Sequence, residues 1–115
     1  MIHLEETKNI KPVDKQLLTD LKSLVLSCIP NATLLLYGSV ARGEQTPESD
    51  YDILVLLRTP ISRQQKTNIR SIIYELELQH SVVMSIMFYT EDEWNSPLVA
   101  ISPYRRSVEI DGILI

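Results

Sequence analysis

Two short apolar runs, residues 34–37 and 53–57, frame a polar stretch that carries a glycine-serine pair at one end and two aspartates at the other. The first run ends in Gly38-Ser39, and the second follows Asp50-Tyr51-Asp52, with ten residues between Ser39 and Asp50. Apolar runs of this length, bounded by turn residues, predict buried strands. The chain is therefore constrained to a sheet that bears a tight turn and two carboxylates at its strand ends.

The two aspartates are the strongest candidates for chemistry. Side chains at positions i and i+2 of a strand point to the same face, so Asp50 and Asp52 project into one small volume. Two carboxylates held that close repel each other unless a proton or a cation lies between them. Mg²⁺ is the usual cation for a site made only of oxygen ligands. The sequence thus predicts Asp50 and Asp52 as ligands of a Mg²⁺ ion.

The Gly38-Ser39 turn is a candidate phosphate site. Its backbone N–H groups lie where the next helix is expected to begin, and N–H groups in such a position bind phosphate oxygens. A metal on one strand and a phosphate on the adjacent turn favour a nucleoside triphosphate as the ligand.

The rest of the chain predicts an α/β (α+β) fold. Apolar spacing favours helices over residues 12–29 and 61–79, and strands over 32–37, 51–57 and 82–89. A helical tail is expected over about 97–111. Helices packed on a small mixed sheet of three or four strands account for this order of elements. On the first helix, we expect Val13 and Cys28 to lie on the buried apolar stripe.

Composition limits the classes of function. With 115 residues, the chain fits one domain, expected over 1–115, and its net charge of −4 disfavours a nucleic-acid surface. A single cysteine, Cys28, cannot form an internal disulfide, which favours a reducing, cytoplasmic location. No apolar run approaches the roughly 18–20 residues that would span a membrane, and the acidic start, Met1 to Glu6, does not look like a signal peptide.

The stretch from Tyr37-Gly38-Ser39-Val40-Ala41-Arg42-Gly43 to Ser49-Asp50-Tyr51-Asp52 resembles the nucleotidyltransferases of the DNA polymerase beta superfamily. Ala-Arg-Gly after Gly-Ser, and a serine before the first aspartate, are similar to the minimal nucleotidyltransferases (MNT) of bacteria and archaea. The resemblance covers roughly residues 12–90, with its motif core at 36–57, and it implies a nucleotidyltransferase fold.

The resemblance implies that a nucleoside monophosphate is transferred from a nucleoside triphosphate, with ATP the expected donor, to a hydroxyl group. Gly38 and Ser39 would bind the outer phosphates, and Asp50 and Asp52 would be the catalytic residues that bind Mg²⁺. Arg42 lies one helical turn beyond Ser39. It would either contact a phosphate or simply face solvent, and the sequence leaves both open.

One position departs from the family pattern. Active members carry a third carboxylate on the following strand, but residues 82–89 contain none, and Ser85 stands at the equivalent place. A serine hydroxyl is a weak, neutral Mg²⁺ ligand. Glu44, Glu48 or Glu91 could approach the aspartates from loops instead.

Two functions therefore stay open. The first is a Mg²⁺-dependent transferase acting on a small molecule or a protein. The second is a nucleotide-binding antitoxin, weak or inactive in catalysis, that works through a HEPN-like protein partner. Relatives include antitoxins of toxin–antitoxin pairs, and at this length a second copy of the chain or a HEPN-like protein would complete the acceptor site.

Overall fold

A mixed sheet of five strands, in the order β1-β5-β2-β3-β4, forms the centre of the molecule. The computed structural model describes residues 1–115. The neighbours β2 and β3 are antiparallel, whereas β3 and β4 are parallel and are joined by a helical crossover. The strands are β1 (Ile2–His3), β2 (Thr33–Tyr37), β3 (Tyr51–Leu57), β4 (Met84–Thr90) and β5 (Ile113–Leu114).

The predicted α/β architecture with a mixed sheet is confirmed, but the sheet has five strands instead of the three or four expected. The additional strands, β1 and β5, have two residues each and lie at opposite ends of the chain. Two residues are too few to show an alternating pattern, and their pairing is set by distant segments. The sequence pattern could not reveal them for this reason.

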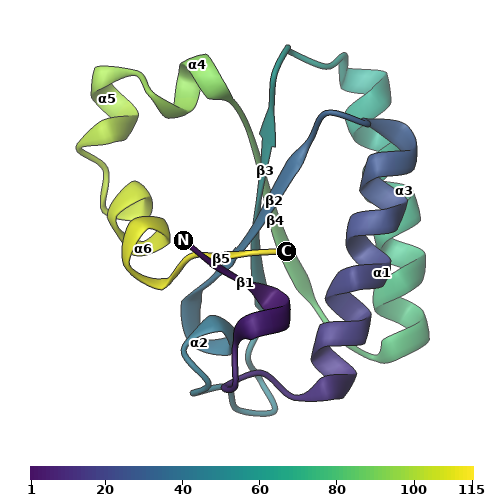
Figure 1. Ribbon diagram of the computed structural model, residues 1–115. Coiled ribbons are helices and arrows are strands. Elements are labelled where there is room, and N and C mark those ends of the chain that lie inside the picture. The colour runs from purple at the N-terminus through teal and green to yellow at the C-terminus, as the bar shows by residue number, and fades with distance from the viewer.

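Helices cover both faces of the sheet (Figure 1). The long helices α1 (Pro12–Cys28) and α3 (Arg63–His80) lie side by side on one face. The other face carries short helices: α2 (Gly38–Ala41), α4 (Glu91–Trp94), α5 (Pro97–Ala100) and α6 (Pro103–Asp111). A single 3-10 turn, η1 (Leu4–Glu6), precedes α1. None of these helices is both long enough and apolar enough to cross a membrane.

Local sequence explains where the long helices begin. Pro12 occupies the first turn of α1, where its missing N–H costs nothing. The hydroxyl of Ser62 accepts a hydrogen bond from the backbone N–H of Gln65, whose side chain in turn accepts one from the N–H of Ser62. This reciprocal capping begins α3 two residues later than predicted.

Strand β3 separates two apolar clusters. Ile53 and Val55 pack in the main core beneath α1 and α3, while Leu54 packs in a smaller cluster under α4 and α6. Asp52 alternates with Ile53, so its carboxylate lies on the side of the smaller cluster. The face that carries α2, α4, α5 and α6 is thus the face that holds the aspartate.

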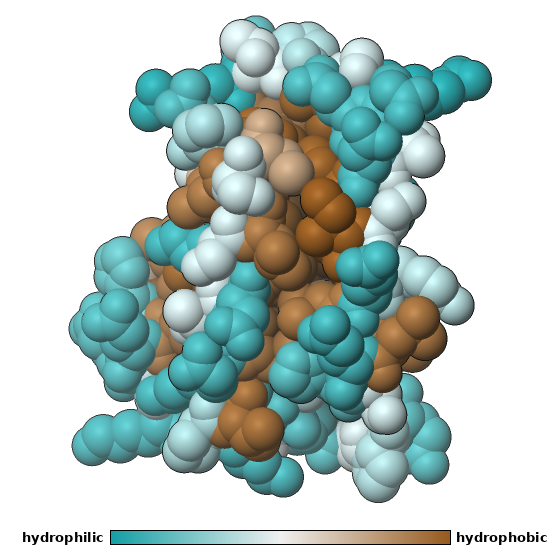
Figure 2. All heavy atoms as spheres, turned by 90° about the vertical axis from the view of Figure 1, so that its right-hand side faces the viewer, coloured by the Kyte–Doolittle hydropathy of each residue, from teal (hydrophilic) through white to brown (hydrophobic).

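The expected positions of Val13 and Cys28 on a buried stripe are wrong. Val13 is 68% exposed, and the thiol of Cys28 is also exposed. Figure 2 shows the side that bears α1 and α3, where apolar side chains form a band between more hydrophilic margins. The buried stripe begins at Asp14, so Val13 falls beside it, and Cys28 is the last residue of the helix, beyond the last buried position, Val25.

Candidate active site

The end of β2 and the start of β3 bring the glycine-serine turn and the aspartates together. In the antiparallel register, Tyr37 pairs with Asp52, so Gly38 lies directly beside that aspartate. A Cβ atom added to Gly38 would lie 2.2 Å from Asp52 Oδ2, and the φ of Gly38 is +80°. Both the close approach and the left-handed backbone require glycine at this position.

The hydroxyl of Ser39 is directed toward the loop that precedes Asp50. Ser39 Oγ donates a hydrogen bond to Ser49 Oγ at 3.2 Å, and the backbone N–H of Thr46 donates to the same Ser49 oxygen at 2.8 Å. These contacts tie the turn to the loop. The predicted residues Gly38, Ser39, Asp50 and Asp52 consequently share one end of β2 and β3.

Arg42 is held by two carboxylates. Its Nη1 donates to Asp111 Oδ2 at 2.7 Å, and its Nε donates to Glu44 Oε2 at 3.4 Å. The Asp111 side chain is only 10% exposed, whereas that of Glu44 is 64% exposed, so the pair with Asp111 is the stronger of the two. Asp111 follows Arg42 by 69 residues and carries no motif. No pattern in the sequence indicates Asp111 as the partner of Arg42.

The aspartate pair shows the electrostatic strain expected of it. Partial burial raises the pKa of Asp52 above its ordinary value, and the negative charge of Asp50 raises it further, while Arg42 acts in the opposite direction. Neither aspartate accepts a side-chain hydrogen bond that would relieve this repulsion. A cation between the two carboxylates would favour the ionised form of both.

Ser85 lies beside Asp52 on the neighbouring strand, where the family resemblance predicts a carboxylate. The parallel register pairs Asp52 with Ser85, so the two side chains point to the same side of the sheet, and Ser85 is exposed. No three His, Cys, Asp or Glu side chains gather anywhere in the chain to form a metal site. Of the loop carboxylates considered from the sequence, Glu44 pairs with Arg42, and Glu91 follows the far end of β4.

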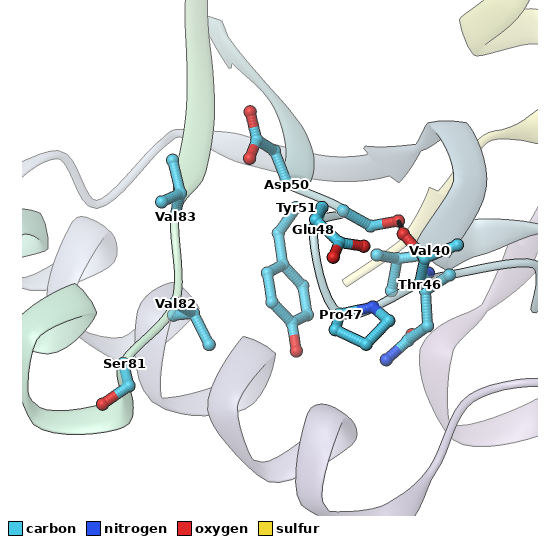
Figure 3. Close-up of a pocket in the computed structure, with 11 residues that line it drawn as sticks. Val40, Thr46, Pro47, Glu48, Asp50, Tyr51, Ser81, Val82 and Val83 are labelled. Atoms are coloured by element: carbon cyan, nitrogen blue, oxygen red, sulfur yellow. Dashed lines mark hydrogen bonds between the residues drawn. The ribbon is translucent and has the colours of Figure 1, made fainter.

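A cavity of about 270 Å³ lies next to the aspartate pair. Asp50, Glu48 and Ser49 line it, and Figure 3 shows the ring of Tyr51 between Val82 on one side and Pro47 on the other. Asp52 and Gly38 do not line this cavity. It therefore adjoins the candidate metal site on the side of Asp50.

The buried carboxylate of Asp14 accepts hydrogen bonds from two residues that line this cavity, Tyr51 and Gln45. The Tyr51 hydroxyl donates to Asp14 Oδ1 at 2.5 Å, and Gln45 Nε2 donates to Asp14 Oδ2 at 3.3 Å. Burial raises the pKa of Tyr51, and the hydrogen bond to Asp14 adds to the rise. Asp14 lies in the first turn of α1, where its negative charge complements the helix end. In the structure it also fixes the tyrosine that separates Asp50 from Asp52.

Comparisons with known proteins show the family to which the chain belongs. The family model described as "Nucleotidyltransferase domain" matches residues 14–115. The chain belongs to this family. A protein of Methanocaldococcus jannaschii, named "Putative protein adenylyltransferase MJ0141", is 32% identical over 56 residues, which are 49% of this chain. That match spans only 57% of the archaeal protein.

Two solved structures share the fold of this nucleotidyltransferase domain. One is described as a toxin–antitoxin with AMP-PNP and superposes with a TM-score of 0.59 at 18% sequence identity. The other is a mutant of the toxin–antitoxin MntA-HpeT, with a TM-score of 0.55 at 16% identity. Each alignment covers 84% of this chain and 69% of the solved chain. The predicted nucleotidyltransferase fold is thereby confirmed.

The raised pKa of Asp52 predicts a pH-dependent effect of Asp52→Asn on stability without metal. A carboxyl group whose pKa is higher in the folded state destabilises the fold as the pH rises through that pKa, and it has no such effect below its unfolded pKa, about 3.9. Asp52→Asn should therefore melt at a higher temperature than wild type at pH 7.5, with the difference shrinking toward pH 4.

Thermal melts in EDTA at both pH values measure this difference. Asp92→Asn is the matched control, because Asp92 is exposed in the first turn of α4, where its charge is favourable. That variant should not gain stability at pH 7.5. A melting temperature of Asp52→Asn below that of wild type at pH 7.5 would contradict the prediction.

Proposed function

We propose that this nucleotidyltransferase domain binds ATP with Mg²⁺ and transfers AMP to a hydroxyl of a small molecule or a protein. Asp50 and Asp52 would hold the metal, and Gly38 and Ser39 would hold the outer phosphates. The single observation that carries the proposal is the placement of Asp52 against Gly38, which joins the carboxylate pair to the phosphate turn in one site.

The residues present fit a nucleotide-bound Mg²⁺. The two carboxylates repel each other and accept no side-chain hydrogen bonds, so their oxygens are free to bind a cation. Mg²⁺ commonly takes one or two protein carboxylates and completes its octahedron with substrate phosphates and water. When bound, the metal would neutralise phosphate charge and polarise the phosphorus that the acceptor attacks.

The chain's own contribution is to position the reactants. The backbone N–H groups at the start of α2 and the Ser39 hydroxyl would orient the outer phosphates, which leave as pyrophosphate when the acceptor oxygen bonds to the innermost phosphorus. Arg42 keeps one nitrogen, Nη2, without a hydrogen bond, and this nitrogen is available to a phosphate oxygen.

The relatives support the choice of donor. One structural neighbour is described as containing AMP-PNP, an analogue of ATP, and the archaeal relative is named as an adenylyltransferase that acts on protein. A protein hydroxyl is accordingly among the acceptors that we propose for this chain.

Calorimetric titration with AMP-PNP tests the nucleotide site. Binding in the presence of Mg²⁺ that disappears in EDTA would support the proposal. Absence of binding for ATP, GTP, CTP and UTP analogues alike would contradict it.

A second function is favoured by Ser85. Without a third carboxylate beside Asp52, the chain would bind nucleotide but transfer it slowly or not at all, and it would act through a partner. Both structural neighbours are described as toxin–antitoxin proteins, which supports an antitoxin role with a HEPN-like protein or a second copy of this chain.

Ser85→Asp distinguishes the two functions. If the missing ligand alone limits the chemistry, the variant should raise Mg²⁺-dependent release of pyrophosphate from ATP by about tenfold or more. The site tolerates the change because Ser85 is exposed on the outermost strand.

The control is Ser71→Asp, which introduces the same charge at an exposed position of α3 on the opposite face of the sheet. No gain in Ser85→Asp, with nucleotide binding and folding intact, would rule out the missing carboxylate as the cause of weak activity.

A further inference from the structure

Helix α6 buries a hydroxyl group that has no hydrogen-bond partner. Tyr104 Oη is the only buried side-chain nitrogen or oxygen of the chain in this condition. A buried donor without a partner destabilises the folded state, and such groups are rare in native proteins. Packing of the Tyr104 ring alone does not explain why its hydroxyl is buried without a hydrogen bond.

Side-chain hydrogen bonds hold both ends of α6, the helix that carries Tyr104. The Ser102 hydroxyl caps α6 by accepting from the N–H of Arg105, and the Arg105 side chain donates to the carbonyl oxygen of Trp94 and to Glu109. At the other end of α6, Asp111 pairs with Arg42. These contacts fix where α6 lies on the sheet, and with it the Tyr104 ring.

An aromatic cluster directs Tyr104 toward the candidate metal site. Its ring lies edge-on to that of Tyr37, with centroids 5.2 Å apart and planes 85° apart. Tyr37 is paired with Asp52 across the β2–β3 register, and the side chains of paired residues extend to the same side of a sheet. The Tyr104 phenol consequently lies on the face of the sheet that carries the Asp52 carboxylate.

The ionisation of these groups agrees with that proximity. Burial raises the pKa of Tyr104 most. The Tyr37 hydroxyl, which lies close to the Tyr104 O–H without the geometry of a full hydrogen bond, raises it next, and Tyr89 and the Asp52 carboxylate add to the rise. The Tyr104 hydroxyl is therefore a neutral O–H donor at neutral pH.

The Asp52 carboxylate lacks a side-chain hydrogen-bond donor, although it is partly buried. Carboxylates that bind metals are usually hydrogen-bonded by further residues, which fix their orientation and tune the metal. The Tyr104 hydroxyl, which makes no full hydrogen bond, and the Asp52 carboxylate, which accepts none from a side chain, thus lie on the same face of the sheet.

We propose that Tyr104 is a positioning residue of the metal site, and that its hydroxyl orients Asp52, directly or through the Tyr37 phenol, when the metal binds. This inference rests on the proposed function, because it requires Asp52 to be a metal ligand. It adds a residue from α6, more than 50 positions beyond the aspartates in the chain, to the site at Asp52.

Titration with Mn²⁺ in the presence of AMP-PNP, followed by the loss of the free-ion EPR signal, tests the inference. Tyr104→Phe keeps the ring and removes only the hydroxyl. We expect it to bind Mn²⁺ about tenfold more weakly than wild type. Its melting temperature without metal should stay the same or rise, since the unpartnered polar atom is gone. A residue that only stabilises the fold would show the opposite combination.

The matched control is Tyr89→Phe, which removes the same atom from the same aromatic cluster. Tyr89 pairs with Leu56, near the far end of β3 from Asp52, so its variant should bind Mn²⁺ as wild type does. Unchanged affinity in a folded Tyr104→Phe, or an equal loss in both variants, would overturn the inference.

Two further measurements separate its failure from that of the proposed function. If wild type binds Mn²⁺, Asp52→Asn does not, and Tyr104→Phe does, only the role of Tyr104 fails. If wild type and Asp52→Asn both fail to bind, the metal site itself is refuted. Should Tyr104→Phe not fold, the Tyr104 ring resonances of the wild-type protein decide the question: a shift on adding Mg²⁺ and AMP-PNP supports the inference, and no shift overturns it.

Discussion

Replacing both Asp50 and Asp52 by asparagine is expected to abolish Mg²⁺-dependent binding of a nucleoside triphosphate. Asparagine keeps the shape of each side chain but removes the two negative charges that face the metal. Loss of a residue that merely supports a metal ligand already costs about 10–100-fold in affinity, so loss of both ligands should exceed about 100-fold. Calorimetric titration with Mg²⁺ and AMP-PNP measures the effect.

The fold of the double variant should be intact, because neither carboxylate makes a hydrogen bond or an ion pair in the structure. Asp92→Asn again provides the control and should bind as wild type does. Wild-type affinity in the double variant would show that the nucleotide binds elsewhere.

Gly38→Ala is expected to weaken nucleotide binding because the added methyl group collides with Asp52. The added methyl group would lie 2.2 Å from Asp52 Oδ2, so the aspartate or the turn must move. The φ of +80° adds backbone strain of about 1–2 kcal/mol for a residue with a side chain. We expect a loss of affinity of at least about tenfold together with a lower melting temperature.

Gly43→Ala separates these two effects. Gly43 also has a positive φ, +73°, but its added methyl group would lie 3.1 Å from the Cβ of Asn9, away from the aspartates. Both variants should therefore lose stability, and only Gly38→Ala should lose the nucleotide. Equal binding by the two alanine variants would show that the contact between Gly38 and Asp52 does not matter for the ligand.

The part of the site that local sequence predicts is the part built from neighbouring residues. Strand β3 runs over Tyr51–Leu57, as predicted, because its apolar pattern and its polar start are both local signals. The turn at Gly38 was predictable for the same reason. In addition, the nucleotidyltransferase motif defines how many residues lie along the sequence between that turn and the aspartates.

Contacts between distant segments were not predictable. Periodicity reports which face of an element is apolar, but it does not say which residue lies opposite. The pairing of Arg42 with Asp111, the burial of Asp14 under Tyr51 and the placement of Tyr104 near Asp52 all depend on how helices dock on the sheet. Each joins segments that are at least 37 residues apart.

The pairing of β1 with β5 has a consequence for the order in which the protein can assemble during synthesis. Ile2 pairs with Ile113, more than a hundred positions later in the sequence, and β1 has no other strand as a neighbour. Arg42 likewise obtains its shorter ion pair only when Asp111 has been made. A nascent chain therefore cannot complete the sheet, or fix Arg42 beside the aspartates, until residues 111–114 have emerged.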